Sequence, residues 1–315
     1  MAACDRGHPE STPPPVSAPS HATAAVGSVG SSAASAPAAV SVAGCTLTPH
    51  ALRTPAPKRL VAIGDIHGDI AAARAALHAA GATSQDDHWI GGDLVVVQTG
   101  DILDRGNDES AILEMFARLA TEAHDAGGAV IQLVGNHELM NAAHDFRYVT
   151  PGGHQDFGGD RAGQLGPGGA WAKRLADHDA IAIVGDTVFS HAGVVGEWAA
   201  HVDQANLETR CWLAGQTQQV ATLLTSDDSP VWTRALGMPG QTDCKLVDDA
   251  LAKLGAKRMV VAHTVQKDGI TSDCDGKLWR IDVGMTKMFG GPIEVLEIKA
   301  AAAGDVVTAL HGHRD

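Results

Sequence analysis

Three clusters of polar and glycine residues follow one another at nearly equal intervals along the chain. Asp101 lies 36 positions after Asp65, and Asn136 lies 35 positions after Asp101. Each interval has the length of one strand–helix–strand crossover, so each cluster should directly follow a strand of a parallel sheet. The clusters are, in order, Gly64-Asp65-Ile66-His67-Gly68-Asp69, Gly100-Asp101-Ile102-Leu103-Asp104-Arg105-Gly106 and Gly135-Asn136-His137-Glu138.

Two further histidines, His191 and His263, follow predicted strands later in the chain. The carboxyl ends of strands in an open α/β sheet form one site, so these side chains should converge with those of the clusters. The carboxylate, amide and imidazole donors suit Mn, Fe or Zn better than Ca. Six donors are too many for one metal with an open position, whereas two metals that share a carboxylate suit phosphoryl displacement. The predicted metal ligands are Asp65, His67, Asp101, Asn136, His191 and His263.

Strand-like and helix-like stretches alternate along residues 58–315, which is typical of an α/β fold. Short β-rich runs predict strands, and runs with apolar residues three or four positions apart predict helices. The predicted strands span residues 59–65, 94–100, 129–135, 180–185, 188–190, 259–262, 277–283 and 293–298, the last two being the final strands. The predicted helices span residues 70–80, 109–126, 171–177 and 245–254, with a polar helical region that ends near Leu224.

Composition limits the classes of protein to which the chain can belong. The 315 residues are 44% hydrophobic and carry a formal net charge of −14. That charge repels phosphate backbones, and because no basic run offsets it, no nucleic-acid partner is expected. No stretch reaches the roughly 20 consecutive apolar residues of a membrane-spanning helix, so no membrane span is expected.

Residues 1–57 differ in composition from the rest of the chain. They hold only four charged residues, whose charges sum to zero, and they are rich in Ala, Ser and Pro. Such a segment buries too little apolar surface to offset its chain entropy. We therefore predict a disordered N-terminal tether over residues 1–57 and a catalytic domain over residues 58–315.

The clusters and the two later histidines resemble the signature blocks of the phosphoprotein phosphatase family of binuclear metallophosphoesterases. The resemblance covers nearly all of residues 58–315. It implies a calcineurin-like metallophosphoesterase sandwich, an α/β fold with central mixed β-sheets flanked by helices. It also implies the division of the ligands: Asp65 and His67 on the first metal, Asp101 as the bridge, and Asn136, His191 and His263 on the second metal.

The same resemblance implies roles in phosphate binding and proton transfer. Arg105 is similar to the family's phosphate clamp, and Arg234, in a Trp-x-Arg segment, resembles a second phosphate-binding arginine of bacterial members. His137 is similar to the general acid, which Asp104 would orient. Two nearby carboxylates, Asp69 and Glu138, either orient metal ligands or simply cap helices.

Two C-terminal segments narrow the resemblance to one subgroup of the family. Residues 280–285 and 290–296 resemble the Shewanella-like protein phosphatases of bacteria and plants. The resemblance implies hydrolysis of phosphotyrosine or phosphoserine/threonine in a phosphorylated protein, with two divalent metals, Mn as the expected ion and Fe or Zn as alternatives. Hydrolysis of diadenosine tetraphosphate or another small phosphate ester is the alternative reaction, and a phosphate sensor without turnover is the alternative from another class.

The five cysteines bear on the compartment of the protein. Cys4, in Met1-Ala2-Ala3-Cys4, resembles the end of a bacterial lipobox, which predicts a lipid anchor there. The remaining four, Cys45, Cys211, Cys244 and Cys274, suffice for two disulfides in any of three pairings. These features favour the bacterial periplasm or cell envelope over the cytoplasm, where thiols stay reduced. The sequence leaves the oligomeric state open.

Two glycine-containing loops complete the predictions. Residues 151–169 are expected to form a flexible rim over the site. Asp273, Asp275 and Gly276 predict a hairpin turn rather than a calcium loop, because the later Glu of a calcium loop is missing.

Overall fold

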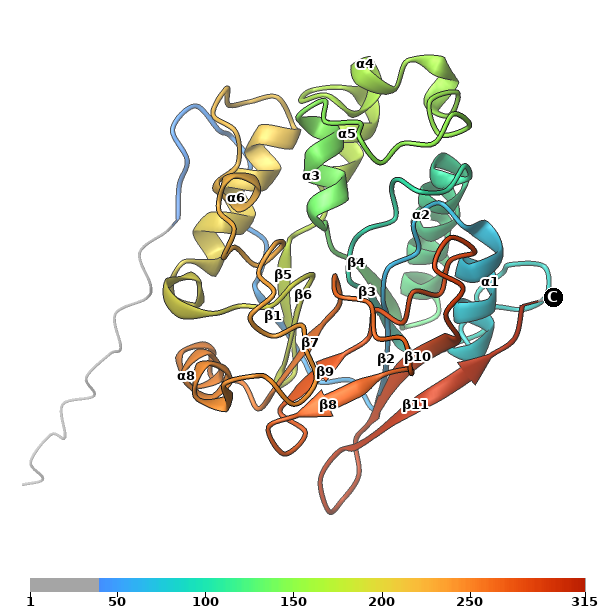
Figure 1. Ribbon diagram of the computed structural model, residues 1–315, viewed down its shortest axis with the longest axis vertical. Helices are drawn as coiled ribbons and strands as arrows, with labels where there is room; N and C mark the ends of the chain where they lie inside the picture. Colours follow the sequence, from blue (N-terminus) through green and yellow to red (C-terminus); the bar gives the residue numbers. More distant parts are fainter. Residues whose placement is uncertain (1–39, 315) are drawn as a thin grey trace, which may run out of the picture. The chain divides into compact units, whose positions relative to one another are not determined.

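Two β-sheets pack face to face in the computed structural model, which describes residues 40–314, and helices lie on their outer sides (Figure 1). This is the predicted α/β sandwich of mixed sheets with flanking helices, and the predicted fold class is confirmed.

The five-stranded sheet contains the strands that precede the three polar clusters. β2, β3 and β4 are parallel, in register from Leu60 with Val95 and from Val95 with Ala129. Helices α1 and α2 make the two crossovers, as the 35- and 36-residue spacing predicts. In spatial order the strands are β11 (Val306–Gly312), β10 (Ile293–Lys299), β2 (Arg59–Ile63), β3 (Val95–Gln98) and β4 (Ala129–Gln132).

The six-stranded sheet contains the strands that precede His191 and His263. β6 and β7 are parallel neighbours at its middle, so the two histidines leave the sheet at the same edge. In spatial order its strands are β1 (Arg53–Thr54), β5 (Ile181–Val184), β6 (Thr187–Ser190), β7 (Arg258–Val261), β9 (Leu278–Arg280) and β8 (Thr271–Asp273).

Alternation along the strands separates two apolar cores. Leu60 and Ala62 of β2 pack against Phe189 and Val260 of the other sheet, in the layer between the sheets. Residues of opposite parity on β2, such as Ile63, belong to the core beneath the helices. Alternate residues of a strand such as β2 therefore face the two apolar cores. Packing on both faces holds the strand ends at fixed positions.

Helices α1 and α2 lie over the five-stranded sheet, with α1 against β10 and β11 and α2 against β4 (Figure 1). Helix α8 packs against β7 of the six-stranded sheet. No helix within residues 40–314 is long and apolar enough to span a membrane. The helices are α1 (Ile70–Ala79), α2 (Glu109–Asp125), α3 (Asn136–Ala142), α4 (Arg161–Leu165), α5 (Ala170–Leu175), α6 (Val202–Leu213), α7 (Thr222–Thr225) and α8 (Cys244–Leu254), with short 3₁₀ turns η1 (Phe157–Gly159) and η2 (Gly196–Ala200).

The folded unit begins before the predicted boundary at residue 58. β1 pairs with β5 in parallel, and a disulfide joins Cys45 to Cys211 of α6. The predicted tether therefore does not include residues 40–57, because backbone pairing and a covalent bond hold them to the domain. Residues 1–39, with Cys4 and its predicted lipid anchor, lie outside the described residues, and those predictions stay predictions.

The C-terminal part holds the other differences from the sequence analysis. β11 follows the strand that was expected to be the last, and the predicted strand over residues 277–283 is reduced to β9. The predicted hairpin turn is confirmed: β8 and β9 are antiparallel, and Cys274 and Asp275 between them adopt positive φ. A second disulfide joins Cys244 to Cys274, which selects one of the three possible pairings.

Candidate metal and phosphate site

The loops that follow the strands bend sharply at the predicted site residues. Five of these residues adopt left-handed backbone conformations: His67, Asp101, Asp104, Arg105 and His263, with φ between 46° and 68°. Such φ values are uncommon outside glycine and tend to occur where function over-determines the backbone. The strained turns project the polar side chains toward a common centre.

Glycines permit the close approach of these loops. A Cβ on Gly135 would lie 2.2 Å from Oδ1 of Asp101, and a Cβ on Gly106 would lie 2.2 Å from the carbonyl carbon of Gly68. The three clusters can therefore converge only because glycine stands at their points of contact.

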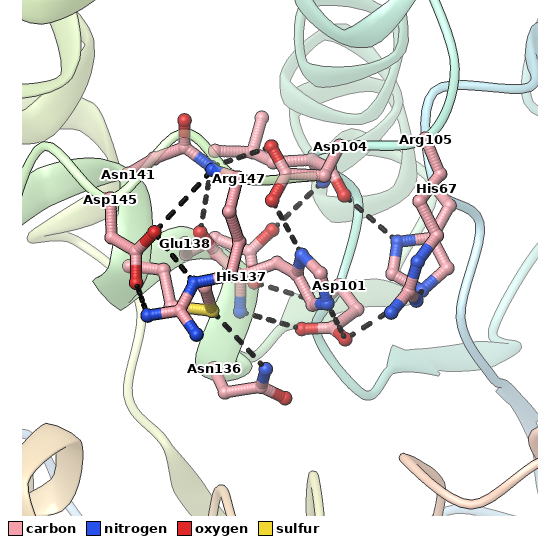
Figure 2. A network of polar contacts seen from close by, with 12 residues as sticks. His67, Asp101, Asp104, Arg105, Asn136, His137, Glu138, Asn141, Asp145 and Arg147 are labelled. Carbon is pink, nitrogen blue, oxygen red and sulfur yellow. Dashed lines mark hydrogen bonds and ion pairs between the residues drawn. The ribbon is translucent and has the colours of Figure 1, made fainter. Parts of the chain in front are cut away.

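Asp101 lies at the centre of the site, with three imidazole nitrogens around one of its oxygens. Figure 2 shows two of these rings, those of His67 and His137, on the side of Asp101. Oδ2 of Asp101 is 3.3 Å from Nε2 of His191, 3.7 Å from Nε2 of His67 and 3.8 Å from Nε2 of His137. Burial by itself would raise the pKa of Asp101, but the imidazoles of His191 and His137 hold it well below its usual value. Asp101 is thus a buried carboxylate toward which several ligand atoms point.

Backbone carbonyls fix the tautomers of two buried histidines, His67 and His191. Nδ1 of His67 donates to the carbonyl of Leu103 at 2.9 Å, and Nδ1 of His191 donates to the carbonyl of Thr99 at 3.0 Å. In the neutral ring, Nε2 is then unprotonated and faces the centre, as in histidines that ligate metals. Burial also lowers the pKa of His67 to about 3, which keeps the ring neutral.

The other predicted ligands close the far side of the centre. Nε2 of His191 lies 2.9 Å from Oδ1 of Asn136 and 3.1 Å from Nδ1 of His263. Oδ1 of Asp65 lies 3.8 Å from Nδ1 of His191. All six predicted ligands therefore gather at one place, on the loops after β2, β3, β4, β6 and β7.

The donor set fits cations. Oδ1 of Asp65 and Nε2 of His263 are buried and have no hydrogen-bond partner. Burial, followed by the nearby carboxylates of Asp282 and Asp101, raises the pKa of Asp65, as expected where negative charges share a site without a counter-charge. Two groups of closely spaced ligand atoms share Asp101, one with His67 and His137 and one with His191 and His263.

Glu138 ties the second and third clusters together. Its carboxylate accepts hydrogen bonds from the backbone N–H groups of Gly135, Asp101, Ile102 and Leu103, at 2.7 to 3.1 Å. Glu138 therefore both caps α3 and fixes the loop that carries Asp101. Asp69 is the other carboxylate whose role the sequence did not decide. It caps α1 by accepting from the backbone N–H of Ala72, and it also accepts from the backbone N–H of Lys287 at 2.8 Å.

His137 and Asp104 form the predicted pair, and the structure adds two further partners of Asp104, Asn141 and Arg161. Nδ1 of His137 lies 2.5 Å from Oδ2 of Asp104, whose other oxygen accepts from Asn141 at 2.8 Å (Figure 2). The same oxygen of Asp104 accepts from Arg161 at 3.0 Å. Arg161 also bonds Glu109 at 2.5 Å, and all of these side chains are buried. Asp104 is thus held from three sides and can orient His137.

Arg161 was not among the predicted site residues, because it lies in the loop at residues 151–169, which was expected to be a flexible rim. Its guanidinium enters the interior, donates to Asn141 and the carbonyl of Gly153, and stacks over Phe157 at 5.3 Å. These contacts anchor the rim to the site. The only signal in the sequence was a lone arginine in a glycine-rich stretch.

The two predicted phosphate-binding arginines differ in their surroundings. Arg105 reaches the centre, where its guanidinium donates to Nε2 of His67 and lies between the rings of Tyr148 and Phe289. Arg234 is exposed and donates to Oγ1 of Thr264 at 3.1 Å, directly beside His263. Both arginines therefore lie next to the metal-ligand cluster, on separate loops.

Comparison with known proteins is consistent with this geometry. The sequence model of the calcineurin-like phosphoesterase family matches residues 58–267. The chain is 36% identical over 305 residues to Shewanella-like protein phosphatase 2 of Arabidopsis thaliana, covering 80% of this chain and 78% of that protein. It is 30% identical over 245 residues to Shewanella-like protein phosphatase 1 of Plasmodium berghei, covering 72% and 67%.

Solved structures of phosphatases also match the chain. A cold-active protein-tyrosine phosphatase of a psychrophilic Shewanella matches with a TM-score of 0.68 and 26% identity, covering 84% of this chain and 83% of that chain. A protein serine/threonine phosphatase of Saccharomyces cerevisiae, at 13% identity and a TM-score of 0.59 over 85% of each chain, shares the fold.

Proposed function

The chain belongs to the calcineurin-like phosphoesterase family and, within it, to the Shewanella-like protein phosphatases, and from this premise we propose which residues carry its reaction. Its similarity to these phosphatases shows that the chain is a metal-dependent protein phosphatase. We propose two divalent cations, with Mn as the expected ion and Fe or Zn as alternatives. Asp65 and His67 would hold one of them, Asn136, His191 and His263 would hold the other, and Asp101 would be shared.

The metals would polarise the phosphoryl oxygens and lower the pKa of the attacking water. The protein's own part begins with the Nδ1–H groups of His67 and His191, which backbone carbonyls hold, so that Nε2 of each neutral ring would face a metal. The carboxylate of Glu138 accepts from the backbone N–H groups of Asp101 and Ile102 and so fixes the loop that positions the Asp101 carboxylate. The site is therefore preorganised before substrate enters.

His137 is proposed to donate the proton to the leaving oxygen. Its Nδ1–H is held by Asp104, which leaves Nε2 to carry the transferred proton when the ring is protonated. Correct positioning of such an acid contributes about 10²- to 10⁴-fold in rate. Arg105 and Arg234 are proposed to bind the phosphoryl oxygens, because a guanidinium pairs with phosphate through two parallel hydrogen bonds.

The observation that carries the proposal is the position of Asp101, a buried carboxylate within 3.8 Å of three imidazole nitrogens. The test is turnover of nitrophenyl phosphate by the protein stripped with a chelator and then reloaded with Mn, Fe or Zn. Activity should vanish on stripping and return on reloading. A protein that binds inorganic phosphate but never turns the ester over would instead be a sensor.

A compartment is proposed on separate grounds. Two disulfides lie within residues 40–314, and such bonds persist in oxidising environments. We therefore propose the cell envelope, with a lipid anchor at Cys4. Fractionation of cells that express the full chain and Cys4→Ser tests this, because only the unsubstituted chain should partition with membranes.

A further inference from the structure

The outer edge of β4 is free of a neighbouring strand. β4 is the last strand of its sheet, and all of its residues are half-buried, whereas β2 and β3 are mostly buried. The backbone N–H of Leu133, just after β4, donates to the carbonyl of Gln98 in β3. Backbone groups alternate in direction along a strand, so the N–H groups of Val130 and Gln132 face away from β3. Apart from one bridge to Asp179, β4 has no strand on that side within residues 40–314.

A groove of about 420 Å³ lies along this free edge. It is lined by β4, by Ala117 and Ala120 of α2, by His50 and by residues 177–179, which lead into β5. None of these residues belongs to the metal and phosphate site. The groove is therefore a separate feature, which the proposed reaction does not explain.

Two buried polar atoms on residues that line the groove have no hydrogen-bond partner. They are Oδ1 of Asp179, which accepts hydrogen bonds, and Nε2 of Gln132, which donates them. Buried polar groups are normally paired, because an unpaired one loses its contacts with water without compensation. A ligand that supplies both a donor and an acceptor would pair both atoms.

The charges around the groove favour a cationic ligand. Its lining holds the carboxylates of Asp177 and Asp179 and no lysine or arginine, and burial lowers the pKa of His178 to about 4, so that ring is neutral. Oδ2 of Asp179 pairs with His50 at 3.1 Å, and Oδ1 lies 3.9 Å from Nε of Arg210. Burial nevertheless raises the pKa of Asp179 against the effect of these two partners. A further positive charge would therefore stabilise the ionised carboxylate.

We propose that this groove is a docking site for an extended, basic segment of a partner protein, which adds as a strand to the free edge of β4. The backbone of such a segment pairs with the edge of the sheet, and its carbonyls can accept from Nε2 of Gln132. An arginine or lysine side chain of the segment pairs with Asp179. A small cation alone would leave Gln132 and the strand edge unpaired, so an extended polypeptide fits the groove better.

The probe is a short fluorescent peptide of alternating valine and arginine, capped at both ends, and its binding to the full chain is measured by fluorescence anisotropy. The peptide should bind at least about tenfold more tightly than the same peptide with glutamate in place of arginine. Its fully N-methylated form has no backbone N–H to donate and should also bind at least about tenfold more weakly.

Two substitutions place the binding in the groove. Ala117→Trp fills part of the groove from the exposed face of α2 and should weaken binding of the basic peptide at least about tenfold. Asp179→Asn removes the charge and should weaken it about tenfold. Hydrogen exchange at the backbone amides of Val130 and Gln132 should slow when the peptide is bound to the unsubstituted chain.

Ala111→Trp is the matched control. Ala111 is also exposed on α2, but it lines a different cavity, together with Arg74 and Arg118. This variant should bind the basic peptide as the unsubstituted chain does. Circular dichroism of both tryptophan variants should match that of the unsubstituted chain, so that lost binding is not lost folding.

Equal binding of the arginine and glutamate peptides, or no binding of the arginine peptide, would overturn the inference. Binding that Ala117→Trp leaves unchanged would also overturn it, because the peptide would then be attracted only by the net charge of −14. Unchanged hydrogen exchange at Val130 in the bound state would contradict the addition of a strand.

Discussion

The centre of the site and its rim are built in different ways. Asp101 and His191 at the centre are buried, closely follow strands and are held by backbone groups from other loops, the N–H of His137 and the carbonyl of Thr99. Tyr148, Arg234 and Phe289 at the rim are exposed and lie on longer connections. The centre is thus fixed mainly by the sandwich, and these three rim side chains make none of the contacts that hold Asp101 and His191. Metal binding and substrate choice should therefore respond to different substitutions.

The rim nevertheless has its own anchors. Arg280, fully buried, bonds Asp273 at 2.7 Å and the carbonyls of Leu236 and Met238, in the segment that follows Arg234. The disulfide between Cys244 and Cys274 closes the same region. Rim loops are therefore supported from below, while their substrate-facing side chains stay free.

The largest expected effect is at the centre. Asp101→Asn should remove metal and lower turnover by at least about a thousandfold, since metal-ion catalysis contributes several kcal/mol. Elemental analysis and nitrophenyl phosphate turnover measure the two effects. Asp228→Asn, at an exposed carboxylate bonded to Ser226, should change neither. Full metal content in Asp101→Asn would show that this residue is not the bridge.

The next effect separates the acid from the metal ligands around it. His137→Asn should slow an alkyl phosphate by about 10²- to 10⁴-fold, and a nitrophenyl phosphate much less, because a good leaving group needs no proton. Metal content should be retained. Equal slowing of both esters would mean that His137 belongs to the centre as a ligand. His124→Asn, on the exposed side of α2, is the control.

Substitution of Arg161 tests whether the buried network around Asp104 stabilises the fold. Arg161→Met leaves Asp104 and Glu109 buried without their guanidinium and should cost about 3–5 kcal/mol in the free energy of unfolding. Chemical denaturation measures this loss. Arg74→Met, which breaks a half-exposed pair with Asp87, should cost only about 0–1 kcal/mol. Similar losses in both variants would contradict a structural role for the buried network.

The smallest effect is expected at the rim. Arg234→Ala should raise KM about tenfold, the value of one charge-assisted hydrogen bond to phosphate, and leave metal content unchanged. Steady-state kinetics of the metal-loaded protein measures it. Lys257→Ala, at an exposed lysine paired with Asp186, should leave KM unaltered. Loss of metal in Arg234→Ala would show that this rim residue also supports metal binding, which contradicts the separation of metal binding at the centre from substrate binding at the rim.

The sequence predicts the centre well because periodic spacing carries the information. Asp65, Asp101 and Asn136 follow strands at the interval of one crossover, so their convergence follows from the parallel sheet. The positions of His191 and His263 follow in the same way, from strand ends of the second sheet. Local pattern and global fold agree at these residues.

The parts that the sequence analysis missed depend on contacts between distant residues. Arg161 meets Asp104 only after the loop folds inward, and Asp282 meets Asp65 only through the packing of the two sheets. Phe289 shares Arg105 with Tyr148 across the mouth of the site, which no periodicity reveals. The two-residue strand β1 was missed because a strand this short has no pattern of its own.

The central claim is that two metals share Asp101. Anomalous diffraction from crystals of the Mn-loaded protein tests it most directly, because it locates the ions independently of activity. We expect two peaks on either side of Asp101, one beside Asp65 and His67 and the other beside Asn136, His191 and His263. A single peak, or peaks that do not touch Asp101, would contradict the account.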